Sequence, residues 1–422
     1  MAFAHRIERD ANRLVRTVSI GDREFQSALP SQDETSDPSS EWWALMLRGK
    51  QPEFISGAPR REVIRLVDLF CGSGGFTTGF RMAAAALGVE VQVQLAVDTD
   101  ADALTVYSAN HRPTEVTSHS VMDLVDAQLF ERDGDYRFFY PPEIDDAFAR
   151  FIGKVDVVTA GPPCQGHSNL NNHTRREDPR NALYPIAAAM GLALGASAML
   201  IENVPAVLND RFRSVDVTKS LLAEAAWQCD DKVLAATKIG WPQTRRRHFL
   251  AASSGDKPIA LAAIEAALAS ERRTLRWAIG DLLDATEDHF LDVPSRLSEE
   301  NDKRVRFLQE QGEYTLPNEL RPLKHRDGHT YPSSYGRLNW EEAAGTITTG
   351  FLTPGRGRFV HPDRPRALTP HEGARIQGFP DSYYFGDVDR PPARGSLAKW
   401  IGDAVPTPLG YAAAFSVLAT LV

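Results

Sequence analysis

The sequence predicts an α/β fold: a doubly wound, mostly parallel sheet with a smaller irregular domain. The first observation is the order strand, glycine-rich turn, helix, strand and acid between positions 63 and 98. The second is a series of further apolar runs, separated in several places by helical stretches, at 155–159, 198–201, 233–236 and 248–252. The third is the loss of this alternation at 256–350, where charges, prolines and short polar runs prevail.

Local patterns place the main elements. We expect a strand at 63–70, a helix at 76–87 and a strand at 91–97. The longest apolar stretch, 185–201, is rich in Ala and Gly, and we interpret it as a buried helix leading into a strand rather than a membrane span. Near the C-terminus, Thr369 and Glu372 have the spacing of a capping box around Pro370, and Gly378 is the expected stop of that helix.

The same signals divide the chain. Residues 1–60 are polar and turn-rich, and we expect a partly disordered N-terminal extension in which Trp42 and Trp43 dock on the main body. The main domain is expected at 61–255, interrupted by the irregular region at 256–350 and resumed at 351–422.

Composition limits the class of protein. Of 422 residues, 42% are hydrophobic and 24% charged, as in an ordinary soluble globular protein. Three cysteines are too few for a disulfide framework, and the N-terminus has no apolar signal core, so we expect a cytoplasmic protein and no metal site. The net charge of −9 argues against a general basic coat, but local basic patches occur at 175–180, 245–247, 324–326 and 356–358.

Cys164 follows a predicted strand directly, on a loop stiffened by Pro162 and Pro163. The two prolines fix φ and remove backbone donors, so this loop has few conformations to lose. A thiol at such a strand end is placed to act as a nucleophile, although a cysteine after a strand more often only packs.

Three further features accompany it. The glycine loop at 68–75 precedes a helix and Asp98 ends the next strand, a combination that favours an adenosine-containing cofactor whose ribose the acid binds. Glu202 ends another apolar strand and is expected to face the same cleft as Cys164, unless it is a capping or ion-paired carboxylate. Arg245 and Arg247 share one face of an extended segment, suited to a phosphate or a pyrimidine carbonyl, or else to an ion-paired edge strand.

Together these features resemble the DNA cytosine C5-methyltransferase family over residues 64 to 422. The matching motifs occur in the family's order: Asp68-Leu69-Phe70-Cys71-Gly72-Ser73-Gly74-Gly75-Phe76, Gly161-Pro162-Pro163-Cys164-Gln165, Glu202-Asn203-Val204, Gln243-Thr244-Arg245-Arg246-Arg247, the helix segment 366–381, and Ile401-Gly402-Asp403-Ala404-Val405-Pro406. The resemblance implies methyl transfer from S-adenosylmethionine to carbon 5 of cytosine in duplex DNA, leaving S-adenosylhomocysteine.

The resemblance also implies roles for individual residues. Cys164 would attack carbon 6, Glu202 would contact ring N3 and the exocyclic amine, and Arg247 with Arg245 would bind the O2 carbonyl. For the cofactor, Phe70 would stack on adenine and Asp98 would bind the ribose. The remaining cofactor contacts expected are Asp68, Gly72, Gly74, Gly75, Asp123, Pro162, Leu183, Asp403 and Ala404.

The target base is inaccessible inside a duplex and must be flipped out. The segment after Cys164 resembles the family's closing loop, and the region at 256–350 its target-recognition domain. The residues expected to contact DNA are Gln165, Ser168, Leu170, Arg175, Arg176, Lys324, Arg326 and Arg337. A cognate nuclease or other defence protein as partner does not follow from the sequence.

Three positions depart from the family's pattern. Many members carry Asn where this chain has Asp403, and a carboxylate is unfavourable beside the carboxylate of the cofactor. Thr99 replaces an aromatic residue after the ribose-binding acid, and Asp123 is only an approximate substitute for the usual Gly-Asp.

Two other functions remain open. One is an RNA cytosine C5-methyltransferase of the same fold, against which the long region before Arg366 argues, because a sequence-reading domain needs that room. The other is a DNA-binding regulator that has lost catalysis, against which Cys164, Glu202 and Arg247 argue.

Overall fold

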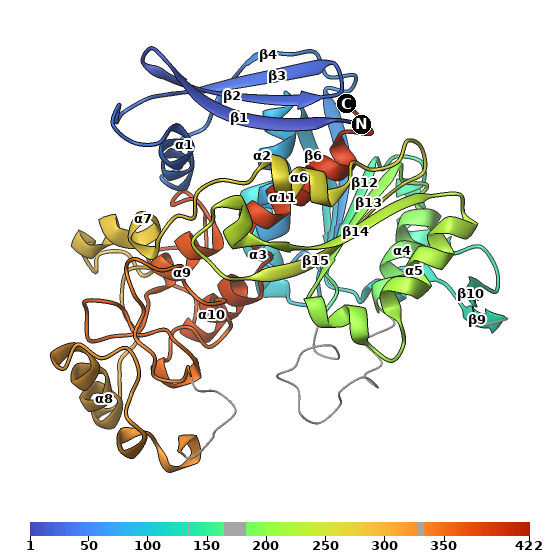
Figure 1. Cartoon of the computed structure of the whole chain (residues 1–422). Coiled ribbons are helices and arrows are strands. Elements are labelled where there is room, and N and C mark those ends of the chain that lie inside the picture. The colour runs from blue at the N-terminus through green and yellow to red at the C-terminus, as the bar shows by residue number, and fades with distance from the viewer. Residues whose placement is uncertain (133–134, 164–182, 327–332) are drawn as a thin grey trace.

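A seven-stranded sheet forms the centre of the molecule (Figure 1). The structure is a computed structural model, and it describes residues 1–132, 135–163, 183–326 and 333–422. The strands of the sheet are, in spatial order, β14 (Gln228–Ala235), β15 (Arg246–Ser253), β13 (Ala198–Asn203), β12 (Val157–Ala160), β5 (Val63–Leu69), β6 (Glu90–Val97) and β7 (Glu115–Thr117).

Six of these strands run in one direction. Neighbours from β13 to β7 pair in parallel, whereas β15 is antiparallel to both β13 and β14. All residues of β12 and β13 are buried, which explains why these strands are mostly apolar rather than alternating. The predicted doubly wound, mostly parallel sheet is confirmed.

Helices cover both faces of the sheet. On one face lie α2 (Gly75–Ala86), α11 (Thr407–Leu418) and α6 (Leu261–Ala267), with α3 (Ala101–His111) beside α2; on the other lie α4 (Leu183–Ala193) and α5 (Ser214–Glu224). Side chains of β5 alternate between the two layers, since Ile64 and Leu66 join the core under α2 and α11, and Val67 and Leu69 join the core under α4. Small two-stranded sheets pair β8 (Val125–Asp126) with β11 (Glu143–Ile144) and β9 (Leu129–Arg132) with β10 (Asp135–Phe138).

The helices α2 and α11 cross very closely. A Cβ atom on Gly79 would lie 2.3 Å from the carbonyl oxygen of Thr407 and 2.6 Å from the backbone nitrogen of Tyr411. Gly410 faces Gly79 from the other helix, and a Cβ there would lie 3.6 Å from the Cα of Gly79. This contact between two glycines returns the C-terminal segment to the first half of the sheet.

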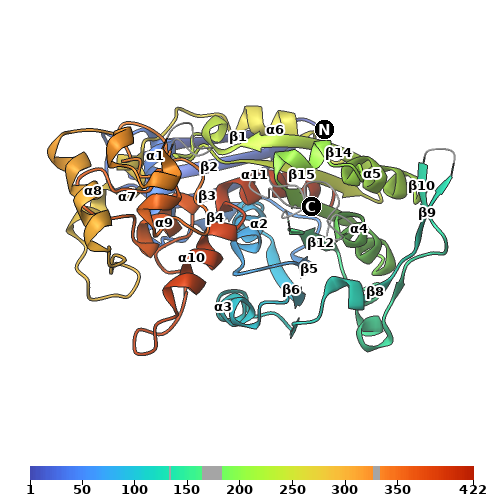
Figure 2. The same ribbon diagram turned by 90° about the horizontal axis from the view of Figure 1, so that it is seen from below.

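The region after α6 contains helices and turns but few paired backbone segments. Its helices are α7 (Leu275–Ile279), α8 (Glu299–Glu310), α9 (Pro370–Gln377) and α10 (Arg394–Asp403). Around α8 a small separate core forms from Val305, Leu308, Leu316, Tyr335 and Val360. In both ribbon views, α8 lies at the end of the molecule opposite β9 and β10 (Figures 1 and 2). We expected this irregular region at 256–350, but the elements differ from those bounds at both ends. The helix α6 packs on α11, β14 and β1, and Val360 and α9, beyond residue 350, pack with the core around α8 and with α7.

The capping signals of α9 are confirmed. The hydroxyl oxygen of Thr369 accepts from the backbone N–H of Glu372, and the Glu372 carboxylate accepts from the backbone N–H of Thr369 at 2.8 Å. Gly378 ends the helix with φ of +92°. No helix in the described part of the chain has the length and apolar character needed to cross a membrane.

The N-terminal residues correct our expectation of a partly disordered extension. They form an antiparallel sheet of β1 (Phe3–Asp10), β2 (Arg13–Ile20), β3 (Arg23–Pro30) and β4 (Glu53–Ser56), with α1 (Pro38–Leu47) against it. The charged residues that suggested disorder alternate along β1 with residues facing the body. The predicted docking of the tryptophans is confirmed, because both are buried and the Trp43 ring packs edge-on against Trp241 at 5.8 Å.

Candidate active site

A cavity of about 460 Å³ opens at the carboxyl ends of the parallel strands. Its walls come from the turn after β5, the ends of β6, β12 and β13, the first part of β15, and the end of α10. Of the predicted site residues, it brings together Asp68, Phe70, Gly72, Gly75, Asp98, Pro162, Glu202, Arg247, Asp403 and Ala404. We call it the active-site cavity below.

The glycine turn after β5 has an unusual backbone. Phe70 has φ of +55°, an uncommon value for a residue with a side chain, and Gly72 has φ of +51°. A Cβ on Gly72 would meet no atom within 4 Å, so the backbone there borders open space. The N–H of Gly72 donates to Asp98 at 2.8 Å, and the N–H of Asp100 donates to the other Asp98 oxygen at 2.8 Å. Asp98 is therefore held in place by backbone donors from both sides.

Asp68 supports this turn from below. Its carboxylate, at the end of β5, accepts from the hydroxyl groups of Thr77 and, at 2.8 Å, of Thr159. Burial raises the pKa of Asp68 to about 6, although these hydrogen bonds oppose the shift. The residue lines the cavity, and its hydrogen bonds join β5 to α2 and β12.

The other glycines of the turn serve close packing. Gly74 caps α2 with φ of +93°, and a Cβ there would lie 2.4 Å from His111 Nε2. A Cβ on Gly75 would lie 2.7 Å from the carbonyl oxygen of Val405. Gly74 does not line the cavity, and its contacts are with His111 and Tyr383 on the opposite side.

Glu202 and Arg247 form an ion pair in the cavity. Glu202 ends β13, Arg247 stands near the start of the antiparallel β15, and Nε of Arg247 lies 2.7 Å from Oε1 of Glu202. Their side chains are 9% and 13% exposed. Burial raises the pKa of Glu202, and the positive charges of Arg247 and Arg245 act against that shift. Glu202 therefore binds a proton more readily than an exposed carboxyl group does, and Arg247 orients it.

The predicted nucleophile cannot be placed. The loop before it is described as far as Pro163, and Pro162, whose carbonyl accepts from the Asn203 side chain at 3.4 Å, is buried. Cys164, Gln165, Ser168, Leu170, Arg175 and Arg176 lie outside the described residues.

Arg245 occupies a different position from Arg247. It is 3% exposed and donates to the carbonyl oxygens of Ile347 at 2.5 Å and of Gly402 and Ala404 at 3.1 Å each. It does not line the cavity. The two arginines do not act as a matched pair, because Arg245 joins the start of β15 to the end of α10 while Arg247 reaches Glu202.

Besides Gly74, two more expected cofactor residues are not brought to the cavity. Asp123 ends a short 3₁₀ turn, where its carboxylate accepts from the backbone N–H of Ser120 at 3.1 Å as part of a capping box. Leu183 begins α4 and is buried there. Neither is among the residues that line the cavity, so their contact with a cofactor stays a prediction.

The arginines predicted to contact DNA use many of their donors within the protein. Arg326 donates to the carbonyl oxygens of Arg321 and Glu319, at 2.9 and 2.7 Å. Arg337 donates to those of Glu313, Gly312 and Pro362. These bonds hold the irregular region together, and DNA contact by either arginine stays a prediction. Lys324 lies in a short 3₁₀ turn, Leu323–His325, and its side chain is outside the described part.

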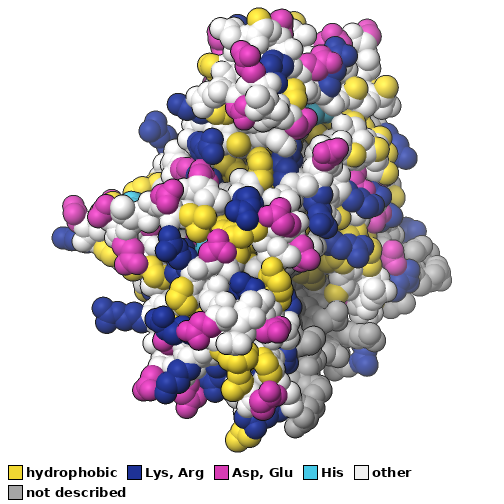
Figure 3. Space-filling model, turned by 60° about the vertical axis from the view of Figure 1, so that its left-hand side comes forward, with side chains coloured by type: hydrophobic (Ala, Val, Ile, Leu, Met, Phe, Trp, Pro, Cys, Tyr) yellow, Lys and Arg dark blue, Asp and Glu magenta, His cyan; other side chains and the backbone are white. Residues whose placement is uncertain are grey.

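One face of the molecule carries charges of both signs. On the face seen in Figure 3, Lys and Arg side chains are interspersed with Asp and Glu. Recognition of an anionic polymer on this face would therefore depend on local groups of basic residues rather than on a uniform positive field.

One contact at the cavity mouth was not predicted. Lys399, on α10, places Nζ 2.5 Å from Oδ2 of Asp100, the N-cap residue of α3. Asp403 lies one helical turn after Lys399, and both line the cavity with Asp98. The sequence does show a lysine four residues before Asp403. Its contact with Asp100 could not be predicted, however, without knowing that α10 faces α3.

Comparison with known proteins agrees with this geometry. The model of the C-5 cytosine-specific DNA methylase family matches residues 64–418. The chain is 39% identical to Type II methyltransferase M1.BsuMI of Bacillus subtilis over 352 residues, which are 83% of this chain and 79% of that protein. It is 27% identical to Type II methyltransferase M.DdeI of Desulfomicrobium norvegicum, over 83% of this chain and 88% of that protein.

Solved structures share the fold. A putative DNA modification methyltransferase encoded within an Escherichia coli prophage superposes with a TM-score of 0.54 at 19% identity, covering 85% of this chain and 99% of that one. Spodoptera frugiperda DNMT2 superposes with a TM-score of 0.53 at 16% identity, covering 84% and 99%. With the family model spanning the sheet, the cavity and the C-terminal return, the chain belongs to the C-5 cytosine-specific DNA methylase family and is a DNA cytosine-5 methyltransferase.

Proposed function

We propose that this enzyme methylates carbon 5 of a cytosine flipped out of a specific duplex DNA sequence, through a covalent bond between Cys164 and carbon 6. The observation that carries the proposal is the Glu202–Arg247 pair, which lines the same cavity as Pro162 and Pro163, the residues just before Cys164. A carboxyl group, a guanidinium and a thiol at one cavity are the groups that activation of a pyrimidine ring requires.

The cavity fits S-adenosylmethionine. Phe70 offers an aromatic ring for an adenine, and Asp98 offers a fixed carboxylate for the ribose hydroxyls. At Gly72 the backbone borders open space, which leaves room for a ligand. Asp403 and Ala404 line the same cavity and would flank the methionine part. When bound, this cofactor supplies an electrophilic methyl group on a positively charged sulfur.

The thiol solves a problem of reactivity. Carbon 5 of cytosine is a poor nucleophile. Addition of the Cys164 thiolate forms an S–C bond at carbon 6 and moves the π electrons of the 5,6 double bond to carbon 5. That carbon would then form a bond to the methyl group, while the bond from this methyl group to the sulfur of the cofactor would break and leave its electrons on the sulfur as a thioether. Removal of the carbon 5 proton by a base restores the double bond, and the electrons of the S–C bond return to sulfur as the thiolate leaves.

Glu202 and Arg247 stabilise charge that develops during the attack. A Glu202 carboxyl with a raised pKa can hold a proton against ring N3 as negative charge accumulates there, and can take it back on elimination. Arg247 orients this carboxyl. It would also donate to the O2 carbonyl of the base. Arg245, fixed by three backbone carbonyls, positions the segment that presents Arg247.

The remaining parts bind DNA. A cavity at the strand ends cannot reach a base stacked in a duplex, so the cytosine must rotate out at a cost of roughly a few kcal/mol. We propose that residues 165–176 close over the flipped base and that residues 256–350 read the sequence. The names of both relatives, Type II methyltransferases, support sequence-specific duplex DNA over tRNA as substrate. We propose a cognate nuclease as a partner on the same ground, the names of these two relatives.

The test traps the covalent intermediate. Sequencing the genomic DNA of an expressing host for methylated cytosines first gives the recognition sequence. A duplex carrying 5-fluorocytosine at that position, incubated with S-adenosylmethionine, should form a denaturant-resistant adduct with the parent enzyme and none with Cys164→Ala. An adduct that maps to another residue, or methylation by Cys164→Ala, would contradict the proposal. Methylation of tRNA but not of duplex DNA would favour the RNA alternative.

A further inference from the structure

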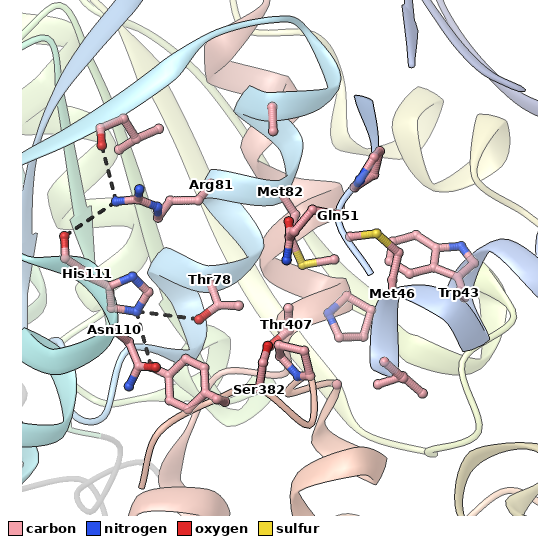
Figure 4. Close-up of a pocket in the computed structure, with 18 of the residues that line it drawn as sticks. Trp43, Met46, Gln51, Thr78, Arg81, Met82, Asn110, His111, Ser382 and Thr407 are labelled. Carbon is pink, nitrogen blue, oxygen red and sulfur yellow. Dashed lines mark hydrogen bonds between the residues drawn. The ribbon is translucent and has the colours of Figure 1, made fainter. Parts of the chain in front are cut away.

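A second cavity, of about 480 Å³, lies behind the glycine turn (Figure 4). It is bounded by α1 and the segment after it, by α2, by the end of α3, and by the loops that precede α11. The proposed reaction uses none of its residues. We call it the rear cavity.

One end of the rear cavity presents an unused hydrogen-bond acceptor. His111 is 6% exposed, and its Nε2 lies 3.1 Å from the carbonyl oxygen of Gly74, which can only accept, so Nε2 carries the proton. Burial lowers the pKa of His111 to about 3, and the ring is neutral. Its Nδ1 is then an acceptor, and within the described residues it has no partner. In Figure 4 the ring stands beside Thr78, with Arg81 above it. A molecule bound there would satisfy Nδ1 with an N–H or O–H group.

Two cations, Arg16 and Arg81, line the same cavity, as does the exposed Glu90. Arg16 is 1% exposed, donates to Ser27 Oγ at 3.0 Å, and lies over the Trp42 ring at 4.8 Å. Arg81 donates to the carbonyl oxygens of Val91 and His111, at 3.2 and 3.5 Å. In the part of the chain that the structure describes, neither forms an ion pair with a carboxylate. Because a buried guanidinium without a counter-ion is costly, an anion in this cavity would be stabilised.

The other end is apolar. Trp43 and Trp241 form an edge-to-face pair there, and the thioethers of Met46 and Met82 complete the wall. Aromatic rings and methionine side chains accommodate a planar ring well. The cavity thus combines a place for a planar ring, an acceptor for an N–H group and a positive field.

The rear cavity is mechanically joined to the cofactor turn. Thr78 donates to the carbonyl oxygen of Gly74 at 2.8 Å, and the Tyr383 hydroxyl donates to that of Ser73. Both side chains line the rear cavity, while Ser73 lines the active-site cavity. The peptide units of this turn are therefore held by residues that a ligand on the far side would contact.

We propose that the rear cavity binds a purine nucleoside monophosphate and that its occupancy changes the affinity of the active-site cavity for the cofactor. The base supplies the planar ring and the N–H donor, and the phosphate supplies the anion. The coupling rests on the cofactor site proposed above, whereas binding of the nucleotide does not.

Calorimetric titration of the full chain with guanosine 5′-monophosphate tests the proposal. Saturating S-adenosylhomocysteine keeps the nucleotide out of the active-site cavity. We expect saturable one-to-one binding, with guanosine and inorganic phosphate at least about tenfold weaker, since each lacks one of the recognised groups. In the reciprocal titration, the nucleotide should change the dissociation constant of S-adenosylhomocysteine by about fivefold or more.

Met82→Trp, which fills the rear cavity, should abolish nucleotide binding and preserve methylation. Ala85→Trp, at an exposed position lining the same cavity, serves if the first variant folds poorly. Met122→Trp is the matched control, because Met122 is 54% exposed and lies outside the cavity, and it should bind as the parent does. Absence of saturable binding would overturn the proposal, as would binding that S-adenosylhomocysteine displaces and Met82→Trp leaves intact. Binding without any change in cofactor affinity would overturn the coupling. Failure of S-adenosylhomocysteine itself to bind would count against the proposed function instead.

Discussion

Arg247 reaches Glu202 from the antiparallel strand β15, with Nε 2.7 Å from the carboxylate at the end of β13. The reversed strand thus delivers a cation to an acid at the edge where parallel strands end. In Glu202→Gln the amide keeps the shape of the side chain but cannot transfer a proton to the ring. We expect kcat to fall by about 10²-fold or more, with DNA affinity changed far less, as single-turnover and binding measurements would show. Lost DNA affinity with an unchanged kcat would contradict the role of Glu202.

Cys164→Ala should abolish turnover while leaving folding and DNA binding largely intact, because it removes one sulfur atom from a loop. Circular dichroism checks that the variant folds, and gel-shift assays check that it binds DNA. Cys229→Ala is the matched control: this thiol is half-buried outside the active-site cavity, and its loss should leave methylation unchanged.

Cys71 lines the cavity, but burial raises the pKa of its thiol strongly, so alkylating reagents should not inactivate the enzyme through it. Equal activity of Cys164→Ala and the parent would refute the nucleophile.

Asp403→Asn should tighten cofactor binding by about threefold to tenfold, equivalent to roughly 1 kcal/mol. Asp98 and Asp403 line one cavity, and the carboxylate of the cofactor would add a third negative charge. The amide removes one of these charges and adds a donor. Equilibrium dialysis with labelled cofactor measures the change, and Asp389→Asn, at an exposed position outside the cavity, is the control. Weaker binding by Asp403→Asn would mean that the carboxylate is used directly.

Lys399→Met should weaken cofactor binding by up to about fivefold, since a half-exposed ion pair contributes at most about 1 kcal/mol. The variant removes the contact with Asp100 that joins α10 to α3 across the cavity mouth. Stopped-flow fluorescence should show faster cofactor dissociation with little change in association. A normal dissociation rate would show that this contact does not restrain the mouth.

His371 makes stability depend on pH. Burial alone lowers the pKa of this side chain, but its hydrogen bonds to Asp292 and Asp381, with their charges, outweigh burial and raise the pKa to about 9. The folded state therefore binds the proton more tightly than the unfolded state, whose pKa is near 6.5. The stabilisation is complete below about pH 6.5 and is lost as the pH rises through about 9.

Denaturant unfolding should accordingly show a cost of up to about 3 kcal/mol for His371→Gln at pH 6, and a much smaller cost at pH 9.5. The same substitution at His289, whose Nδ1 accepts from the backbone N–H of Leu291 at 3.3 Å, provides the comparison. A cost for His371→Gln that does not vary with pH would show that the imidazole acts only by packing.

Much of the fold was predictable because its signals are local. The apolar run before the glycine turn and the capping box of α9 each fix an element from a few neighbouring residues. The N-terminal sheet was missed because its outer faces carry many charged residues, so that only pairing between strands reveals the buried side. The reversal of β15 is likewise invisible in a sequence, since its apolar part, 249–252, predicts a strand without predicting the direction of that strand.

The residues of the site also differ in how far the sequence predicts their positions. Glu202 and Asp98 were predictable because strand ends converge at one edge of a parallel sheet. Arg245 and Arg247 looked equivalent, yet one binds backbone carbonyls of residues far along the chain and the other an acid. Asp123, expected to contact the cofactor, makes a local capping hydrogen bond and does not line the cavity. Lys399 gained a partner only through the tertiary approach of α10 to α3.

The close crossing of α2 and α11 has a consequence for biosynthesis. Gly79 emerges early from the ribosome, but the helix against which it packs, and the cavity wall at Asp403 and Ala404 just before that helix, emerge hundreds of residues later. Nascent chains halted short of that wall are therefore incapable of marking DNA, and the cell acquires the activity only when translation has passed α11.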